Sequence, residues 1–366
     1  MGCDPYVLGF EPILIEKVWG GRRLERYGKR LDAHKTYGES WELSDLGETS
    51  KSGAGGAAAR SVVVGGAFDG RLIGEVVSEW GAELLGQSAW DGVCARAEAR
   101  GTAPAFPLLL KFLDAREHLS VQVHPSPSFA AQHAWANLKT ESWLVLEADE
   151  ATLPSGRVER PTIFTGLERG VDASSFAAAI EDGSVVGQLG RCEAMPGACH
   201  TLPSGLVHAL GGGVLVLEVQ TPSDTTFRVY DWAAEYGRSG RELHVDEAIA
   251  CVDFEPGVGG QVSPGAERSP VGFGRGAGSA EVASTERYGI GVVSCGSGGM
   301  ALAGLDLPGA GCRAVVGLSG SGRLVADGAA SELAAGRTLL VPACASDVFV
   351  EAVGDEPLDV AVIEVR

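Results

Sequence analysis

Four side chains of types that bind metal ions lie in three short segments of the sequence. Gln122 and His124 stand two residues apart in the strand-like run LSVQVHPS, so they project from the same face. Glu141 lies in KTESW at the start of an apolar run, and His208 lies in the glycine-rich segment PSGLVHALGGG before another. Two imidazoles, one carboxylate and one amide oxygen are a plausible set of ligands for a borderline divalent metal.

The remaining histidines carry no comparable signal. A single histidine in a β protein is more often structural or exposed than a metal ligand, so we expect no metal role for them. They are His34, His118, His133, His200 and His244, and none lies beyond residue 254. We also expect Trp41 and Trp232 to be packing residues, and Lys111 to have a structural or supporting role.

The elements that must position the four candidate ligands are mostly strands. Short β-branched runs separated by glycine and proline predict a mainly β protein, as in residues 61–64, 119–124 and 214–220. Helical spacing of apolar residues is confined to the neighbourhoods of residues 72–85, 173–189 and 245–251. We therefore expect a few peripheral helices around a β core.

Charge and composition narrow the range of partners. The formal net charge is -19, which disfavours nucleic acid and anionic membrane surfaces and favours a small molecule. An anionic small molecule would then need a local cluster of cations or a metal. Eight cysteines without CxxC spacing, no apparent signal sequence and no long apolar run favour a reducing cytoplasm.

Several ordered blocks resemble the type I phosphomannose isomerases of the cupin superfamily. They are FEPILIEKVWGGRRLERYGKRL, GESWELSD, FPLLLKFLDAREHLSVQVHPS, KTESW and PSGLVHALGGGVLVLEVQTPSDTTFRVYDW. The resemblance implies one zinc ion per chain, bound by Gln122, His124, Glu141 and His208. It also implies the interconversion of mannose 6-phosphate and fructose 6-phosphate through an enediol.

The resemblance extends to residues that would act on the sugar. Arg228 in TTFRVYDW has a permanent charge suited to an enediolate or a sugar oxygen, and is our first catalytic candidate among the nonligands. Lys139 is expected in the pocket as a proton shuttle or phosphate partner. Ser120 matches a serine that touches phosphate, while Glu218 and Asp224 match acidic residues near the reacting sugar. Either acid could be the catalytic base.

The family's fold predicts a cupin, or jelly-roll, catalytic domain with a second, smaller β-sandwich. We assign the catalytic domain to residues 1–254, with a short helical insertion at about 171–189. A Gly/Pro-rich linker is expected at 255–284, followed by a jelly-roll-like structural domain at 285–366.

Two other functions remain open from the sequence. A cupin metal-dependent oxygenase would use two histidines and one carboxylate around iron, although Gln122 as an additional ligand counts against it. A nonenzymatic protein that binds sugar phosphates is the second alternative, and retention of Arg228 and Lys139 argues against it.

Overall fold

The structure is a computed structural model that describes residues 6–49, 55–254, 261–262, 278–296, 299–302 and 311–366. Its described residues form four main antiparallel sheets with few helices, so the predicted mainly β fold is confirmed. The strands predicted within residues 119–124 and 214–220 are β8 (Val121–Val123) and β16 (Val214–Gln220).

Two sheets build the first sandwich. Sheet I consists, in spatial order, of β18 (Gln261–Val262), β14 (Cys199–Leu202), β9 (Glu141–Ala148), β16, β7 (Leu109–Ala115), β2 (Ile13–Gly21) and β3 (Tyr37–Leu43). Sheet II consists of β13 (Leu189–Glu193), β12 (Thr162–Leu167), β15 (His208–Leu210), β8 and β17 (Phe227–Tyr230).

Two further sheets build the second sandwich. Sheet III consists of β19 (Gly278–Ser284), β20 (Tyr288–Cys295), β27 (Leu358–Val365), β22 (Arg313–Ser319), β25 (Thr338–Val341), β1 (Leu8–Phe10) and β6 (Val63–Val64). Sheet IV consists of β21 (Met300–Ala301), β26 (Phe349–Ala352), β23 (Ser321–Ala326) and β24 (Ala329–Ala334). Two small ribbons pair β4 (Asp45–Leu46) with β5 (Ala59–Arg60), and β10 (Ala151–Thr152) with β11 (Val158–Glu159).

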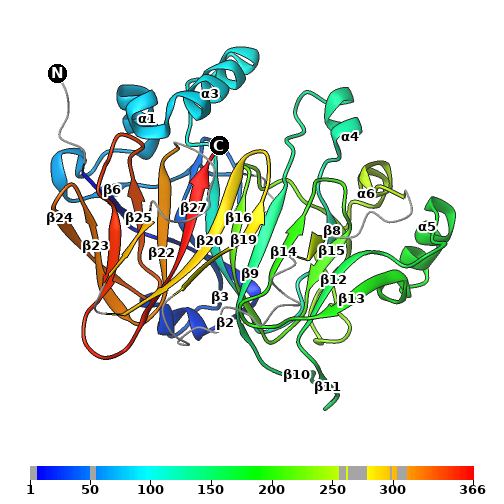
Figure 1. Ribbon diagram of the computed structural model, residues 1–366. Helices are drawn as coiled ribbons and strands as arrows, with labels where there is room; N and C mark the ends of the chain where they lie inside the picture. Colours follow the sequence, from blue (N-terminus) through cyan, green and yellow to red (C-terminus); the bar gives the residue numbers. More distant parts are fainter. Residues whose placement is uncertain (1–5, 50–54, 255–260, 263–277, 297–298, 303–310) are drawn as a thin grey trace.

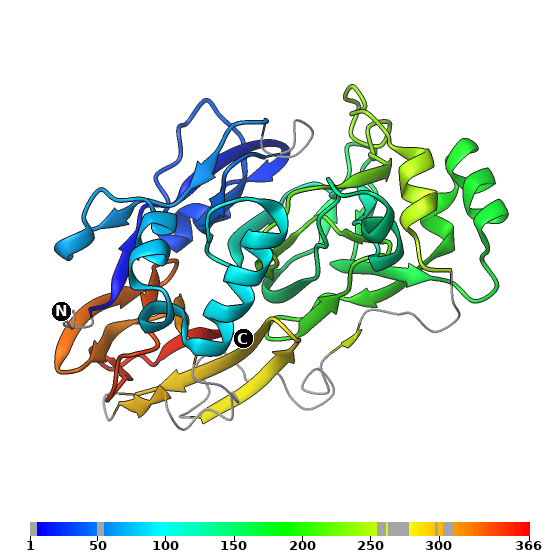
Figure 2. The same cartoon turned by 90° about the horizontal axis from the view of Figure 1, so that it is seen from above.

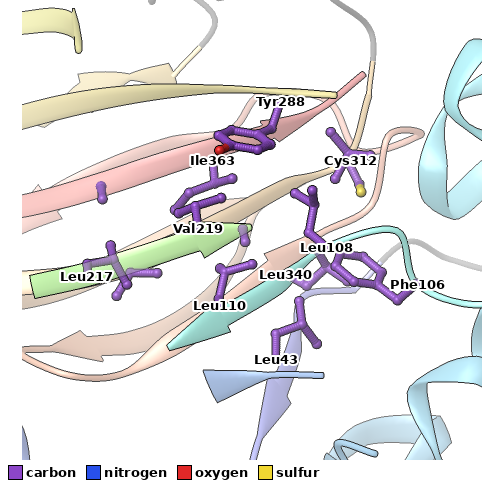
Figure 3. Packing of buried hydrophobic residues seen from close by; sticks show 14 of the residues in the cluster. Leu43, Phe106, Leu108, Leu110, Leu217, Val219, Tyr288, Cys312, Leu340 and Ile363 are labelled. Atoms are coloured by element: carbon purple, nitrogen blue, oxygen red, sulfur yellow. The ribbon is translucent and has the colours of Figure 1, made fainter. Parts of the chain in front are cut away.

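The four sheets lie in the order IV, III, I, II across the molecule (Figure 1). Sheets I and III face each other across the largest apolar core. Leu110, Leu217 and Val219 from sheet I meet Leu340 and Ile363 from sheet III (Figure 3). Strand alternation therefore points the other face of sheet I toward sheet II.

Two groups of helices flank the sheets (Figures 1 and 2). The first group is α1 (Ile73–Trp80), α2 (Ala82–Leu85) and α3 (Gln87–Arg100), whose apolar side chains join the core between sheets I and III. The second group covers the outer face of sheet II and contains α4 (Pro127–Gln132), α5 (Ala173–Glu181) and α6 (Val245–Cys251). Short 3-10 helices are η1 (Arg23–Tyr27), η2 (Gly66–Phe68) and η3 (Val185–Gln188).

Two helices, α3 and α4, lie outside the helical segments expected from the sequence. The interior of α3 buries only small or medium side chains, Ala89, Val93 and Ala97, so its apolar stripe is weak. The helix α4 has only 6 residues and begins with Pro127 after the N-cap Ser126. None of the described helices is long and apolar enough to span a membrane.

The predicted division at 1–254 and 285–366 does not coincide with the sheets. Strands β1 and β6 from the first range complete sheet III, where Leu8 pairs with Leu340 and Gly9 pairs with Val64. Most of the predicted linker at 255–284 lies outside the described residues, but its end is wrong, because 278–284 forms β19 against β20. Small residues dominate this segment, GSAEVAS, so its alternation is too weak to indicate a strand.

Candidate active site

Three of the predicted metal ligands converge from the two sheets of the first sandwich. Glu141 begins β9 in sheet I, His208 begins β15 in sheet II, and His124 follows β8. All three are buried, and their ligating atoms lie within 4.8 Å of one another. The Nε2 atoms of His208 and His124 are 3.1 and 3.4 Å from the Glu141 carboxylate oxygens Oε1 and Oε2, respectively.

The hydrogen bonds of the two imidazoles fix which nitrogen faces the carboxylate. The Nδ1 atom of His208 is 2.8 Å from the carbonyl oxygen of Leu206, and that of His124 is 2.9 Å from the carbonyl oxygen of Thr225. A carbonyl only accepts, so both Nδ1 atoms carry hydrogen and both Nε2 atoms face the carboxylate. Burial, aided by the charge of Lys139, lowers the pKa of His124 to about 3, which keeps this ring neutral at neutral pH.

The Glu141 carboxylate lies between the two imidazoles. Burial favours its neutral form, but Lys139 and the imidazoles outweigh burial and hold the pKa of Glu141 well below its ordinary value. Its Oε1 atom has no hydrogen-bond partner among the described residues and lies 3.1 Å from Nε2 of His208. A buried carboxylate whose oxygens face two imidazole nitrogens is an arrangement that a bound cation stabilises.

The fourth predicted ligand, Gln122, lies beside this cluster. It is the register partner of His208 in β15 and of Arg228 in β17. Its Nε2 is 3.4 Å from His208 Nε2, while its Oε1 accepts a hydrogen bond from Ser120 at 3.2 Å. The amide nitrogen therefore faces the cluster, and a ligand role requires the amide to turn by 180°.

A tight turn leads the chain from His208 in sheet II to strand β16 in sheet I. The segment GGG connects β15 in sheet II to β16 in sheet I. Gly213 has a φ of +83°, and a Cβ there would lie 2.0 Å from the carbonyl oxygen of Asp149. Only glycine fits this crossing, which explains the glycine-rich sequence after His208.

Lys139 places a buried ammonium group against the cluster. Its Nζ contacts Glu141 Oε2, lies 3.2 Å from His124 Nε2 and lies 3.9 Å from Glu218 Oε1. The two-residue spacing to Glu141 thus gives the shared face that the sequence analysis predicted. Lys139 connects the metal-ligand cluster to the acidic residue Glu218.

A second charged network continues across sheet I. Lys111 lies 3.3 Å from Glu218 and 3.7 Å from Glu39, and Lys17 lies 3.1 Å from Glu39. Trp143 donates to Glu218 at 2.9 Å. Burial opposes ionisation of Glu39, but Lys17 and Lys111 lower its pKa to about 2.

Lys17 and Glu39 are cavity residues that no local pattern in the sequence indicates. The alternation in GESWEL places Glu39 and Trp41 on one face, but only the pairing of β3 with β7 puts that face beside Lys111. Trp41 is a buried packing residue, as expected, and its indole also lines the cavity, where it donates to Glu39 at 2.6 Å and lies 4.7 Å from Lys111. Trp232 packs against His118, also as expected.

Arg228 lies on the opposite wall of the same cavity. Its Nη1 donates to the carbonyl oxygen of Glu242 at 2.8 Å, and its Nε is 3.9 Å from Asp231. Burial and the neighbouring Arg241 lower the pKa of Arg228 to about 10, so the side chain is charged at neutral pH. Asp231 accepts its close hydrogen bonds from Arg238 and Arg241.

One polar cavity connects these side chains. It is lined by six of the predicted residues, namely Ser120, Gln122, Lys139, Glu218, Asp224 and Arg228. His124, Glu141 and His208 are buried beside Lys139 at its wall, so the structure brings all nine predicted residues together. Lys17, Glu39, Lys111 and Arg241 also line this cavity.

The other histidines lie outside the cluster of potential ligands found among the described residues. His118 approaches Glu159 at 2.7 Å and lies beside Trp232, while His200 is buried on β14 near Cys192. Burial lowers the pKa of His200 to about 4.

The chain is similar to proteins of one kind in both sequence and structure. A relative described as a probable mannose-6-phosphate isomerase, GmuF of Bacillus subtilis, is 34% identical over 250 residues, covering 67% of this chain and 68% of that protein. The crystal structure of the mannose 6-phosphate isomerase from Bacillus subtilis matches with a TM-score of 0.72 at 25% identity, covering 98% of this chain and 99% of that chain.

A more distant structure shares the fold. It is a mannose 6-phosphate isomerase bound with zinc and yttrium, which matches with a TM-score of 0.66 at 15% identity and covers 98% of this chain and 99% of that chain. No protein-family model matches the chain.

Proposed function

The chain belongs to the mannose-6-phosphate isomerase family, and on that premise we propose that it interconverts mannose 6-phosphate and fructose 6-phosphate in the cavity between sheets I and II. The observation that supports this best is the buried cluster of His124, Glu141 and His208 beside the cationic groups of Lys139 and Arg228. These cations offset locally the repulsion that a net charge of -19 exerts on a sugar phosphate.

One zinc ion per chain fits the residues present. His124, His208 and Glu141 offer two imidazole nitrogens and a carboxylate, and Gln122 would complete the set after its amide turns. When bound, zinc supplies a Lewis acid for oxygens of the sugar and its enediolate. A neutral Gln122 leaves the site with a net positive charge, which favours the anionic intermediate.

Proton transfer between the two neighbouring sugar carbons needs a group that accepts and returns a proton. We assign this role to Lys139 and Glu218, whose charged atoms are 3.9 Å apart in the cavity. Trp143 and Lys111 hold Glu218 in place from two sides. Asp224 lines the same cavity and is the alternative base.

Arg228 and Ser120 would hold the two ends of the substrate. The guanidinium group of Arg228 is held in position by its hydrogen bond to the Glu242 carbonyl oxygen. Its Nε lacks a hydrogen-bond partner among the described residues. This is the arrangement expected of a donor for the enediolate oxygen. Ser120 and the ammonium of Lys139 are proposed to contact phosphate.

A coupled assay on mannose 6-phosphate tests the function. We expect turnover to disappear after chelation and to return with zinc. His208→Asn should weaken zinc binding by more than about 10- to 100-fold, since even the loss of an outer partner of a ligand has that effect. The matched control is His200→Asn, another buried histidine of the first sandwich, which should retain zinc and activity.

Two results would reject the proposal. Full zinc occupancy in His208→Asn would exclude the ligand assignment, whereas absence of isomerase activity in zinc-loaded protein would exclude the reaction. Bound iron with oxygen consumption would favour the oxygenase alternative. The absence of both turnover and oxygen uptake would favour the nonenzymatic binding protein.

We also place the protein in the cytoplasm. Six cysteines among the described residues form no disulfide, which supports a reducing compartment; they are Cys94, Cys192, Cys199, Cys251, Cys295 and Cys312.

A further inference from the structure

A second cavity lies behind the segment that contributes Lys139 and Glu141. It has a volume of about 920 Å³ and is bounded by α3, the residues around α4, and the turn between β19 and β20. Residues 138–140 separate it from the active site. Alternation points Lys139 into the active-site cavity, whereas Leu138 and Thr140 line the second cavity.

Three arginines from two distant parts of the chain line this cavity. Arg96 and Arg100 lie on α3, one turn apart, and Arg287 lies in the turn before β20. Among the described residues, no carboxylate lies within ion-pairing distance of any of the three guanidinium groups, although Glu286 also lines the cavity. Burial and the positive charges of Arg287 and Arg100 lower the pKa of Arg96, so the three charges repel one another.

The other lining groups suit an organic molecule. The hydroxyl groups of Thr221 and Thr285 donate to the carbonyl oxygens of Leu138 and Tyr288, so toward a ligand they offer acceptor oxygens and methyl groups. Ala130, Pro203 and Pro222 provide apolar surface. Arg96 is partly buried and Arg100 and Arg287 are exposed, and the three cations gather at this cavity in a chain whose formal net charge is -19. Guanidinium groups bind phosphate through paired hydrogen bonds, and a bound anion would remove their mutual repulsion.

We propose that this arginine cavity is a second binding site, distinct from the active site, for a small phosphorylated molecule with a body of sugar or nucleoside size. Arg96, Arg100 and Arg287 hold its phosphate groups, and the threonine hydroxyls and apolar residues contact its body. A ligand there touches Leu138 and Thr140, and therefore sits one residue from both Lys139 and Glu141 along the chain.

Calorimetric titration of the zinc-loaded protein with fructose 1,6-bisphosphate tests the site. We expect an arginine-dependent site in wild-type protein that survives in Arg228→Ala, where the active site is impaired. In Arg96→Gln/Arg287→Gln the affinity of this site should fall at least about 10- to 100-fold, because two charged hydrogen-bond donors are lost. The matched control Arg26→Gln/Arg323→Gln removes the same charge from exposed arginines and should bind normally.

Stability and activity separate loss of the site from loss of the fold. Removing two repelling charges should leave the thermal midpoint of the ligand-free variant unchanged or raised, and mannose 6-phosphate turnover without added bisphosphate should stay at the wild-type level. Equal bisphosphate affinity in wild-type protein and in Arg96→Gln/Arg287→Gln would overturn the proposal. So would loss of all binding in Arg228→Ala, because the bisphosphate would then occupy the active site alone.

Discussion

The two sandwiches share an architecture but differ in what their interiors contain. In the first, one end of the interior is apolar, with Leu113, Trp143 and Val216. Two residues along the same three strands, the same face presents Lys111, Glu141 and Glu218. Among the described residues, the interior of the second sandwich is an apolar cluster, with residues such as Val315, Leu324, Val350 and Val360.

The difference shows how a common scaffold acquires a site. Between positions two residues apart on β7, β9 and β16, the packed core gives way to a charged cavity, and the strands keep the same register. Buried charges cost free energy unless they are paired, and here each is paired with a neighbour. Function thus resides in a few positions of one sandwich, while the other contributes stability.

The largest effect should come from removing a charge in the polar interior. We expect Arg228→Ala to lower kcat by about 100- to 1,000-fold, the loss typical of one oxyanion donor, while zinc content stays unchanged. Arg228→Lys should recover only part of the rate, because it keeps the charge but loses the planar fork. The control Arg323→Ala alters an exposed arginine of the second sandwich and should leave kcat unaffected. An unchanged kcat in folded Arg228→Ala would remove Arg228 from the reaction.

A core substitution in the second sandwich should have the opposite profile. Leu324 is fully buried, so Leu324→Ala should lower the free energy of unfolding by about 2–5 kcal/mol in urea titrations. Below the unfolding transition, kcat and zinc content should match those of the wild type. Leu324→Met keeps the volume and should cost less than about 1.5 kcal/mol. A proportional fall in kcat would contradict the separation of roles between the sandwiches.

The smallest effect concerns pH, where the two sandwiches should respond with opposite signs. Burial lowers the pKa of His200 from 6.5 to about 4, so between these values the unfolded chain binds the extra proton and acid destabilises the fold. His200→Asn should reduce the slope of stability against pH by up to about 1.4 kcal/mol per pH unit there. Burial raises the pKa of Glu364 above 4.5, so its ionisation costs stability as pH rises.

Urea titrations of metal-free protein at several pH values measure the contributions of His200 and Glu364 to the free energy of unfolding. Glu364→Gln should become more stable than wild type as pH rises above 4.5. His200→Asn should differ from wild type mainly at acidic pH. Parallel pH profiles for the two variants would show that burial does not set these protonation states.

Local pattern was sufficient for most of the site. The spacing of Gln122 with His124, and of Lys139 with Glu141, requires only strand alternation, and matching blocks indicated His208 and Arg228. Glu39 and Lys17 could not be found this way, because they approach Lys111 only through pairing between distant strands. The membership of β1 in sheet III could not be predicted for the same reason, since no local feature of residues 8–10 specifies a partner near residue 340.

That pairing has a consequence for the order of synthesis. At about 5–20 residues per second, roughly 20–60 s separate the emergence of Leu8 from that of its partner Leu340. During this interval the first sandwich can form, but sheet III lacks its central strands. Val64, which pairs with Gly9, emerges much earlier. The ribbon of β1 and β6 can therefore exist before β25 is made, and it shields one edge of β1 until the last strands of the chain arrive.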